Sequence, residues 1–293
     1  MSLSFIPLHP VFTAEVRGLD LRQVPDADTL HRIHLAMEQH AVLVFRGQPI
    51  DDDAQMAFAR ALGPLEPTPA VVDADKHRLK HREMADISNL DLDGSLLPPD
   101  DRRRMFNLGN RLWHSDSSFK ATPARYSMLH ARVIPDAGGD TEFADMRAAW
   151  DALDARTQAR LLPLVARHSL LFSRAQLGFS GFTDEERERF APVPQRLVRR
   201  VPGSQRLSLY LSSHIGAIDG WPTPEAMAMV RDLIEHATQR QFVYRHVWKT
   251  HDLVMWDNRA TMHRARPYED QTQPRDMRRA TLQDVAPTLA QPV

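Results

Sequence analysis

The chain has 293 residues and a formal net charge of −1, from 37 basic and 38 acidic side chains. This balance gives no electrostatic basis for binding nucleic acid or an anionic membrane surface. Cysteine is absent, which excludes disulfides, thiolate metal sites, iron–sulfur clusters and cysteine nucleophiles. A metal would therefore have to rest on His, Asp or Glu. No apolar run approaches the ~20 residues of a membrane span and no targeting segment stands out, so we expect a cytoplasmic protein.

The N-terminal part of the chain predicts alternating strands and helices. Residues 11–20 alternate loosely and end in a glycine-containing turn, which is typical of a strand. Residues 26–40 begin with aspartates and carry Leu30, Ile33 and Met37, which favours a helix. Residues 41–45 are a short continuous apolar run, typical of a buried strand. Residues 51–62 predict a second helix, opened by three aspartates at its positive end.

The segment 63–111 is different in character. It is rich in proline, highly charged and poorly periodic. A loop of this length inside a compact domain is usually functional, so we predict an active-site lid here.

Short strands dominate after residue 111. We expect strands at 124–133, in a short run from Asp140, and at 165–172, 196–201, 207–211, 241–248, 253–256 and 277–282, with helices at 145–164 and 223–238. Many short strands with a few helices predict a mainly β fold with added helices, built on a double-stranded β-helix (jelly-roll, cupin-like) core. We expect residues 1–293 to form a single domain. No dinucleotide-binding or P-loop glycine motif is present.

One His-x-Asp triplet, Trp113-His114-Ser115-Asp116, is a candidate metal site. It carries little weight alone, because chance produces such triplets in a chain with 14 histidines. On a strand, however, residues i and i+2 point to the same face, so both side chains could reach one ion. A second histidine from a distant strand would complete a two-histidine, one-carboxylate face, which is diagnostic of non-haem Fe(II) oxygenases. The alternative is a surface histidine beside a capping aspartate.

Further motifs agree with the metal site. The blocks are ADISNLDLDG (85–94), LWHSDSSF (112–119), GGDTEFADMRAAWDAL (138–153), EHATQRQFVYRH (235–246), DLVMWDNRATMHR (252–264) and RDMRRAT (275–281). In these blocks, and in order over nearly the whole chain, the sequence resembles the 2-oxoglutarate-dependent dioxygenases of the taurine dioxygenase group. Within that group it is most similar to the 2,4-dichlorophenoxyacetate dioxygenases.

The resemblance implies a role for individual residues. It makes His114, Asp116 and His263 the ligands of Fe(II), and it places the distal carboxylate of 2-oxoglutarate on Thr141 and Arg275. No catalytic side chain beyond the metal ligands is implied.

Four residues are candidates for substrate contact. Arg279 occupies the position that holds the anionic head group of the substrate in the resembling enzymes. Residues 275, 277 and 279 of a strand share one face, which sets the guanidinium groups of Arg275 and Arg279 about 13 Å apart. Arg278 then points to the other face, where we expect a solvated surface charge. The resemblance also places His214 and Ser117 near the substrate, and Lys80 in the predicted lid is a further candidate. Without the resemblance His214 reads as a core or surface histidine, and the alternative for Lys80 is a solvent-facing charge.

The reaction that the resemblance implies uses Fe(II), 2-oxoglutarate and O₂. Hydroxylation of the carbon next to the ether oxygen of an aryloxyacetic acid, such as 2,4-dichlorophenoxyacetate, would give a phenol and glyoxylate, with succinate and CO₂ from the cosubstrate. The implied partner is a small anionic aromatic substrate, and we expect a homo-oligomer. Two alternatives stay open at this point: a sulfonate or sulfate-ester dioxygenase of the same group, and a metal-dependent hydrolase or binding protein without redox activity.

Overall fold

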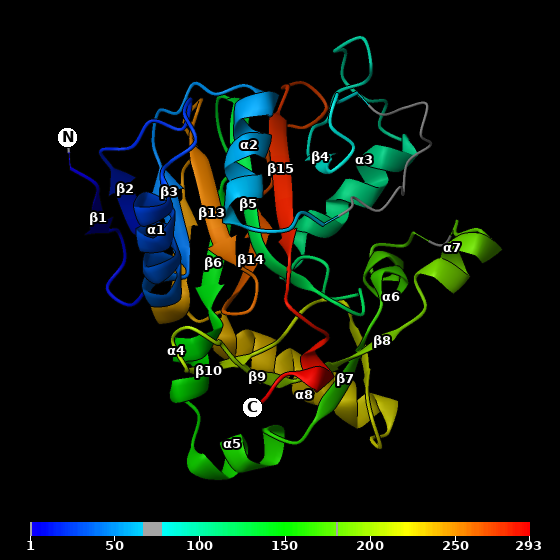
Figure 1. Cartoon of the computed structure of the whole chain (residues 1–293). Helices are drawn as coiled ribbons and strands as arrows, with labels where there is room; N and C mark the ends of the chain where they lie inside the picture. The colour runs from blue at the N-terminus through cyan, green and yellow to red at the C-terminus, as the bar shows by residue number, and fades with distance from the viewer. Residues whose placement is uncertain (1, 67–77, 180) are drawn as a thin grey trace.

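A computed structural model describes residues 2–66, 78–179 and 181–293 of the chain. Its largest element is a seven-stranded sheet in the order β1-β2-β3-β13-β5-β15-β4 (Figure 1). The strands are β1 (Ser4–Pro7), β2 (Ala14–Arg17), β3 (Val42–Phe45), β4 (Met84–Asp86), β5 (Ala124–Val133), β13 (Leu253–Asp257) and β15 (Asp276–Gln283). Neighbouring strands are antiparallel except β2 and β3, which are parallel. Late strands thus pair with early ones at the centre of the sheet.

Two helices, α1 (Ala27–His40) and α2 (Asp52–Leu62), cover one face of this sheet (Figure 1). Asp26 and Asp51 cap them, because each side chain accepts a hydrogen bond from a backbone N–H of the first turn. The buried sides of the helices pack with Phe45, Met128 and Leu282 of the strands. Both predicted helices and the predicted strand at 41–45 are confirmed.

A second sheet of three strands packs against the large one. Its order is β12-β6-β14, with β6 (Thr141–Asp145), β12 (Val243–His246) and β14 (Thr261–Ala265). Phe143 of β6 joins Trp256 of β13, Leu129 of β5 and Met277 of β15 in one apolar cluster. Phe143 and Trp256 have ring centroids 5.5 Å apart. This cluster joins the two sheets at the point where the candidate metal ligands gather.

The remaining elements form a third layer with its own core. They are β7 (Val165–His168), β8 (Val193–Arg196), β9 (Val198–Arg200), β10 (Leu207–Leu209), β11 (Ile215–Ile218), α4 (Met146–Asp151), α5 (Ala155–Leu161), α6 (Leu170–Ala175), α7 (Asp184–Arg189), α8 (Thr223–Ala237), η3 (Arg240–Phe242) and η4 (Thr288–Ala290). Helices α4 and α8 pack on strands β9, β10 and β11 through Trp150, Leu209 and Val230. No helix among the described residues is long and apolar enough to cross a membrane.

Several predicted elements differ in detail from the observed ones, among them the strands predicted at 196–201 and 241–248, and two further cases show the reason. The predicted helix at 145–164 is two helices, α4 and α5, because Asp154 caps a new helix with bonds from Arg156 N and Thr157 N. The predicted strand at 165–172 ends at His168, where Ser169 caps α6 by accepting from Phe172 N. In both places a short polar side chain accepts hydrogen bonds from backbone N–H groups, so the preceding element ends and a new helix begins.

The described part of the segment 63–111 contains more regular structure than its composition indicates. It contains β4, the short helix α3 (Arg102–Asn107) and the 3₁₀ helix η2 (Leu108–Arg111). Asp101 caps α3 by accepting from Arg103 N. Residues 67–77 of the predicted lid lie outside the described residues.

Candidate metal centre and active-site cavity

The two halves of the His-x-Asp…His pattern are joined by backbone hydrogen bonds. His114 N donates to His263 O at 3.0 Å, and His263 N donates to His114 O at 2.9 Å. His263 lies on β14, whereas His114 forms only an isolated bridge and the chain turns at Asp116. The segment is therefore a single β-bridge rather than the strand that the argument from spacing assumed, yet it still brings both side chains to one place.

His114, Asp116 and His263 offer ligand atoms that all lie within 4.8 Å of one another. The Nε2 atoms of both histidines are 3.7 Å from oxygens of Asp116. All three residues are buried, with 4–6% of their surface exposed. Such convergence of one carboxylate and two imidazoles in a buried site is the geometry of a metal centre.

Both histidines are held as neutral imidazoles. Burial lowers the pKa of His114 and lowers that of His263 well below its usual value, since a charged ring loses its hydration. The His114 ring meets Leu112 O through Nδ1 at 2.7 Å. Donation from Nδ1 leaves Nε2 as a lone-pair donor facing Asp116, which is the form that binds a metal.

Asp116 is held as a carboxylate. Burial alone would raise its pKa, but Arg279, His263 and His114 outweigh it and bring the pKa to about 2. Arg279 Nη1 donates to Oδ1 at 2.7 Å, and Ser127 Oγ donates to Oδ2 at 2.7 Å. The backbone N of Asp116 donates to Asn258 Oδ1 at 3.0 Å. Sequence reasoning missed Ser127 and Asn258; the only signal was that Asn258 belongs to the quoted block 252–264.

The donor set fits Fe(II). Two neutral imidazoles and one ionised carboxylate on one side of an ion leave further coordination positions for other ligands. Hydrogen bonds to Leu112 O, Ser127 and Arg279 orient His114 and Asp116, as is usual around protein metal sites. The His263 ring is held by packing against Phe143 and Trp256.

A cavity extends from the triad. His114, His263, Thr141, Arg275 and Arg279 all line it. Its other wall comes from the segment 63–111 and the loop after β14, with Ile87, Ser88, Asn89, Arg104, Asn107, Leu108, Asn110, Arg111, Arg266, Tyr268 and Asp270. The structure therefore brings the metal triad and the predicted 2-oxoglutarate residues to one space.

Arg275 lies at the cavity without a counter-ion among the described residues. Its side chain is buried, yet among the described residues no carboxylate lies at ion-pair distance from it. Its Nη2 donates to Gly139 O at 3.4 Å, and its guanidinium lies 5.9 Å from the Tyr268 ring centroid. Gly139 has φ +70° and a Cβ there would crowd Pro135, which favours glycine at this turn. Asn89 Oδ1 accepts from Arg275 N at 2.8 Å and fixes the backbone.

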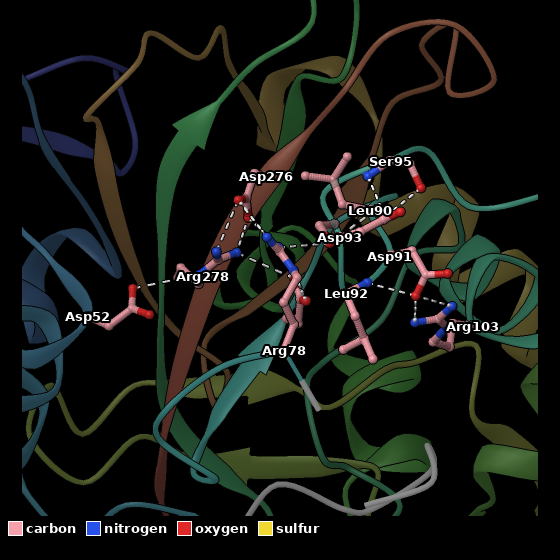
Figure 2. Close-up of polar contacts among 12 residues, drawn as sticks. Asp52, Arg78, Leu90, Asp91, Leu92, Asp93, Ser95, Arg103, Asp276 and Arg278 are labelled. Carbon is pink, nitrogen blue, oxygen red and sulfur yellow. Dashed lines mark hydrogen bonds and ion pairs between the residues drawn. The ribbon is translucent and has the colours of Figure 1, made fainter. Parts of the chain in front are cut away.

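Arg278 corrects one sequence expectation. It points away from the cavity as predicted, but it is buried rather than solvated. Figure 2 shows it beside Asp276 and Arg78, with Asp52 on the other side. Arg78 pairs with both Asp276 and Asp86. Helix α2 covers this face of β15, so the charge is neutralised by a network instead of by water.

The other substrate candidates have different surroundings. His214 is buried, with its ring 6.2 Å from the His114 ring and its Nδ1 2.9 Å from Ser173 Oγ. Ser117 has φ +52° and its Oγ donates to Glu66 Oε2 at 2.7 Å, so its hydroxyl is engaged. Lys80 is exposed and pairs with Asp53 at 2.9 Å. It belongs to a separate surface hollow beside α2, not to the metal cavity. Ion pairing at the surface of α2 thus takes Lys80 away from the site.

Comparison with known proteins defines the class of this chain. The model of the Taurine catabolism dioxygenase TauD, TfdA family matches residues 4–281. The chain belongs to this family of dioxygenases and is accordingly an oxidoreductase.

Individual members of the family are similar to this chain over nearly its whole length. The chain is 48% identical, over 98% of its length and 99% of the relative, to the alpha-ketoglutarate-dependent 2,4-dichlorophenoxyacetate dioxygenase of Cupriavidus pinatubonensis. It is 39% identical to the (S)-phenoxypropionate/alpha-ketoglutarate-dioxygenase of Sphingobium herbicidovorans, over 92% and 91% of the two chains. A crystal structure of AAD-2 in complex with Mn(II) and N-oxalylglycine is 51% identical, with a TM-score of 0.91 over 99% and 100% of the chains.

Proposed function

We propose that this protein is an Fe(II)- and 2-oxoglutarate-dependent dioxygenase of aryloxyacetic acids such as 2,4-dichlorophenoxyacetate. The observation that carries the proposal is the cavity lined by the two histidines of a buried His-Asp-His triad together with Arg275 and Arg279. The names of the relatives, and the metal and N-oxalylglycine in AAD-2, support the same chemistry. N-oxalylglycine is an analogue of 2-oxoglutarate.

Different residues of the cavity would bind the metal and the cosubstrate. His114, Asp116 and His263 would hold Fe(II), and Arg275 with Thr141 would hold the distal carboxylate of 2-oxoglutarate. When bound, Fe(II), 2-oxoglutarate and O₂ supply oxidative decarboxylation coupled to hydroxylation of an aliphatic carbon. A charge-assisted, two-pronged arginine contact orients its anion as well as attracting it.

Arg279 would hold the substrate carboxylate. Its guanidinium reaches the cavity while Nη1 rests on Asp116 Oδ1, so an anion bound to it lies beside the metal triad. The carbon between that carboxylate and the aryl ether oxygen is then the reacting carbon. Its hydroxylation gives a hemiacetal, which collapses to a phenol and glyoxylate.

A hydrolase or a non-redox binding protein fits the cavity less well. Such a protein does not need a buried arginine without a carboxylate partner. In a dioxygenase, 2-oxoglutarate would supply the carboxylate that Arg275 lacks. A sulfate-ester or sulfonate dioxygenase remains the alternative outcome of the tests, since a guanidinium accepts both anions.

The architecture is also part of the proposal. We propose that the large sheet and the β12-β6-β14 sheet form a double-stranded β-helix core, in one domain of residues 1–293. The packing of Phe143 between the sheets supports this. The described part of segment 63–111 supplies Asn89, Arg104 and Arg111 to the cavity wall, which supports a lid role. A homo-oligomer and a cytoplasmic location stay predictions.

The test is made in two stages. Fe(II) and then 2-oxoglutarate are added anaerobically, and a weak visible metal-to-ligand band is expected in the wild type but not in His263→Ala. Aryloxyacetates, alkyl sulfates and alkyl sulfonates are then screened aerobically for succinate formation, with phenol measured in parallel. Phenol and succinate in equal amounts from an aryloxyacetate support the proposal. Absence of the band, or turnover of sulfates alone, contradicts it.

A further inference from the structure

The buried arginines of this fold divide into two groups. Six arginines are buried among the described residues: Arg147, Arg174, Arg199, Arg259, Arg275 and Arg278. Four of them pair with a neighbouring carboxylate, namely Asp145, Asp284, Asp257 and Asp276. Arg275 and Arg174 have no such partner within the described chain. A buried charge without a counter-ion is strongly destabilising, so its retention indicates that an anion arrives as a ligand.

Arg174 lies on α6, on the side of the molecule where α3 packs (Figure 1). It is 6% exposed. Its Nη1 donates to Ser173 Oγ at 3.0 Å, and its buried Nε has no hydrogen-bond partner. The guanidinium stacks 4.3 Å from the Phe106 ring centroid, and a Cβ at Gly109 would collide with it. Helix α3 and η2 thus enclose the charge without neutralising it.

The same charge lies beside the metal triad. Ser173 Oγ, which accepts from Arg174, also contacts His214, whose ring packs against His114. Burial and the nearby charge of Arg279 lower the pKa of Arg174 to about 10, and Asp116 opposes this shift. Arg174 therefore remains charged at neutral pH and senses both Arg279 and Asp116. Because Arg279 repels the charge of Arg174, an anion within reach of both cations would relieve the repulsion.

We propose that Arg174 is a second anchor of the substrate carboxylate, opposite Arg279. This inference rests on the proposed function and adds a residue to it. Arg279 has already committed Nη1 to Asp116, whereas Arg174 keeps a free donor in an enclosed, largely apolar setting. An aryloxyacetate carboxylate held between the two would neutralise both charges.

The experiment measures binding rather than turnover. The anaerobic Fe(II)–2-oxoglutarate complex is titrated with phenoxyacetate, and the dissociation constant is taken from the change in the visible band. In Arg174→Met, phenoxyacetate should bind roughly ten- to a hundred-fold more weakly, as expected for a lost hydrogen bond to a charged group. The affinity for 2-oxoglutarate should stay within about two-fold. Arg174→Lys, which keeps a charge, should recover part of the loss.

Arg102→Met is the matched control, because Arg102 also stacks on an aromatic ring of this region, that of Phe179, but is exposed and paired with Glu186. It should bind phenoxyacetate like the wild type. Unchanged phenoxyacetate binding in Arg174→Met would overturn the inference. So would an equal loss in Arg102→Met, a parallel loss of 2-oxoglutarate affinity, or an Arg174→Lys variant as weak as Arg174→Met, since these assign the effect to packing.

Failure of the proposed function gives a different result. If wild-type protein does not bind phenoxyacetate, the aryloxyacetate assignment fails, and the same variants are compared with hexyl sulfate. A selective loss of hexyl sulfate binding in Arg174→Met then still supports an anion anchor. If neither anion changes the spectrum of the wild type, both proposals fall.

Discussion

Single hydrogen bonds at the triad decide which atoms can face a metal. The contact between His114 Nδ1 and Leu112 O directs Nε2 toward Asp116. Ser127 and Asn258 hold the side chain and the backbone of Asp116, and Asn258 Nδ2 also donates to Ser127 Oγ at 2.9 Å. The ligand geometry is thus built before a metal arrives, which lowers the entropic cost of binding it.

Removal of one ligand should abolish metal binding. Asp116→Ala or His263→Ala takes away one of three protein ligands, and we expect the fold to survive. We expect loss of turnover and little iron retained after desalting, measured with a chromogenic chelator. Asp53→Ala, an exposed carboxylate paired with Lys80, is the control. Iron content equal to wild type in either ligand variant would remove that residue from the site.

Substitution of Arg275 and substitution of Arg279 should raise the KM of different ligands. Each contact to a charged group is worth about 1.5–3 kcal/mol, or roughly ten- to a hundred-fold in KM. Arg275→Ala should raise the KM for 2-oxoglutarate with a smaller effect on the aryloxyacetate. Arg279→Ala should do the reverse and uncouple succinate from phenol formation. The measurement is a pair of steady-state titrations with both products quantified. If both variants raise only the KM for 2-oxoglutarate, Arg279 is not the substrate anchor.

At the scale of elements, one aspartate ties the segment 63–111 to the loop that carries Arg275. Asp270 accepts from Arg104 and Arg111, each at 2.9 Å. Asn89 Nδ2 donates to Asp270 O at 2.8 Å. Helix α3, η2 and the loop after β14 are therefore tied together as one wall of the cavity.

Asp270→Asn should loosen this wall. The substitution weakens the two partly exposed ion pairs of Asp270, which together contribute about 1 kcal/mol to holding the wall closed. Their loss should raise the population in which the wall is detached by roughly five-fold. Amide hydrogen exchange in residues 102–111 should quicken, and the KM for 2-oxoglutarate should rise. Glu186→Gln, which frees Arg102 at the other side of α3, is the control and should leave that KM unchanged. Equal hydrogen exchange in Asp270→Asn and the wild type would show that the ion pairs of Asp270 do not hold this wall in place.

At the scale of the whole molecule, a buried histidine links stability to pH. His168 on β7 is fully buried, stacks on Tyr210 at 5.7 Å, and neither ring nitrogen has a hydrogen-bond partner. Burial lowers its pKa to about 3. Below about pH 6.5 the imidazole of His168 is protonated in the unfolded chain but stays neutral in the folded protein. The free energy of unfolding therefore falls as the pH drops from about 6.5 toward 3.

His168→Phe should make the stability less dependent on pH. The variant keeps a ring against Tyr210 and removes the titrating group, whose contribution changes by up to about 1.4 kcal/mol per pH unit. Urea unfolding at pH 7, 6 and 5 measures the slope. His31→Gln, at an exposed position of α1, should keep the wild-type slope. A His168→Phe slope equal to wild type would assign the acid sensitivity to other groups.

Most local elements and the candidate metal ligands could be predicted from the sequence alone. Asp26 and Asp51 mark their helices because a cap needs only neighbouring residues. His114, Asp116, His263 and Arg275 were found through motifs, since a metal site and an anion site need particular side chains. Each of these signals is local in the chain or fixed by residue type.

Only the tertiary structure decided how charge is handled. Arg278 is buried because α2 covers its face of β15, and Lys80 is diverted by Asp53. Ser127 reaches Asp116 from β5, and Asn258 reaches it from the turn after β13. Arg174 becomes a buried, unneutralised charge only where α3 and α6 meet. Burial and hydrogen bonding between distant segments set the energy of a charge, and neither is written in the spacing of residues along one segment.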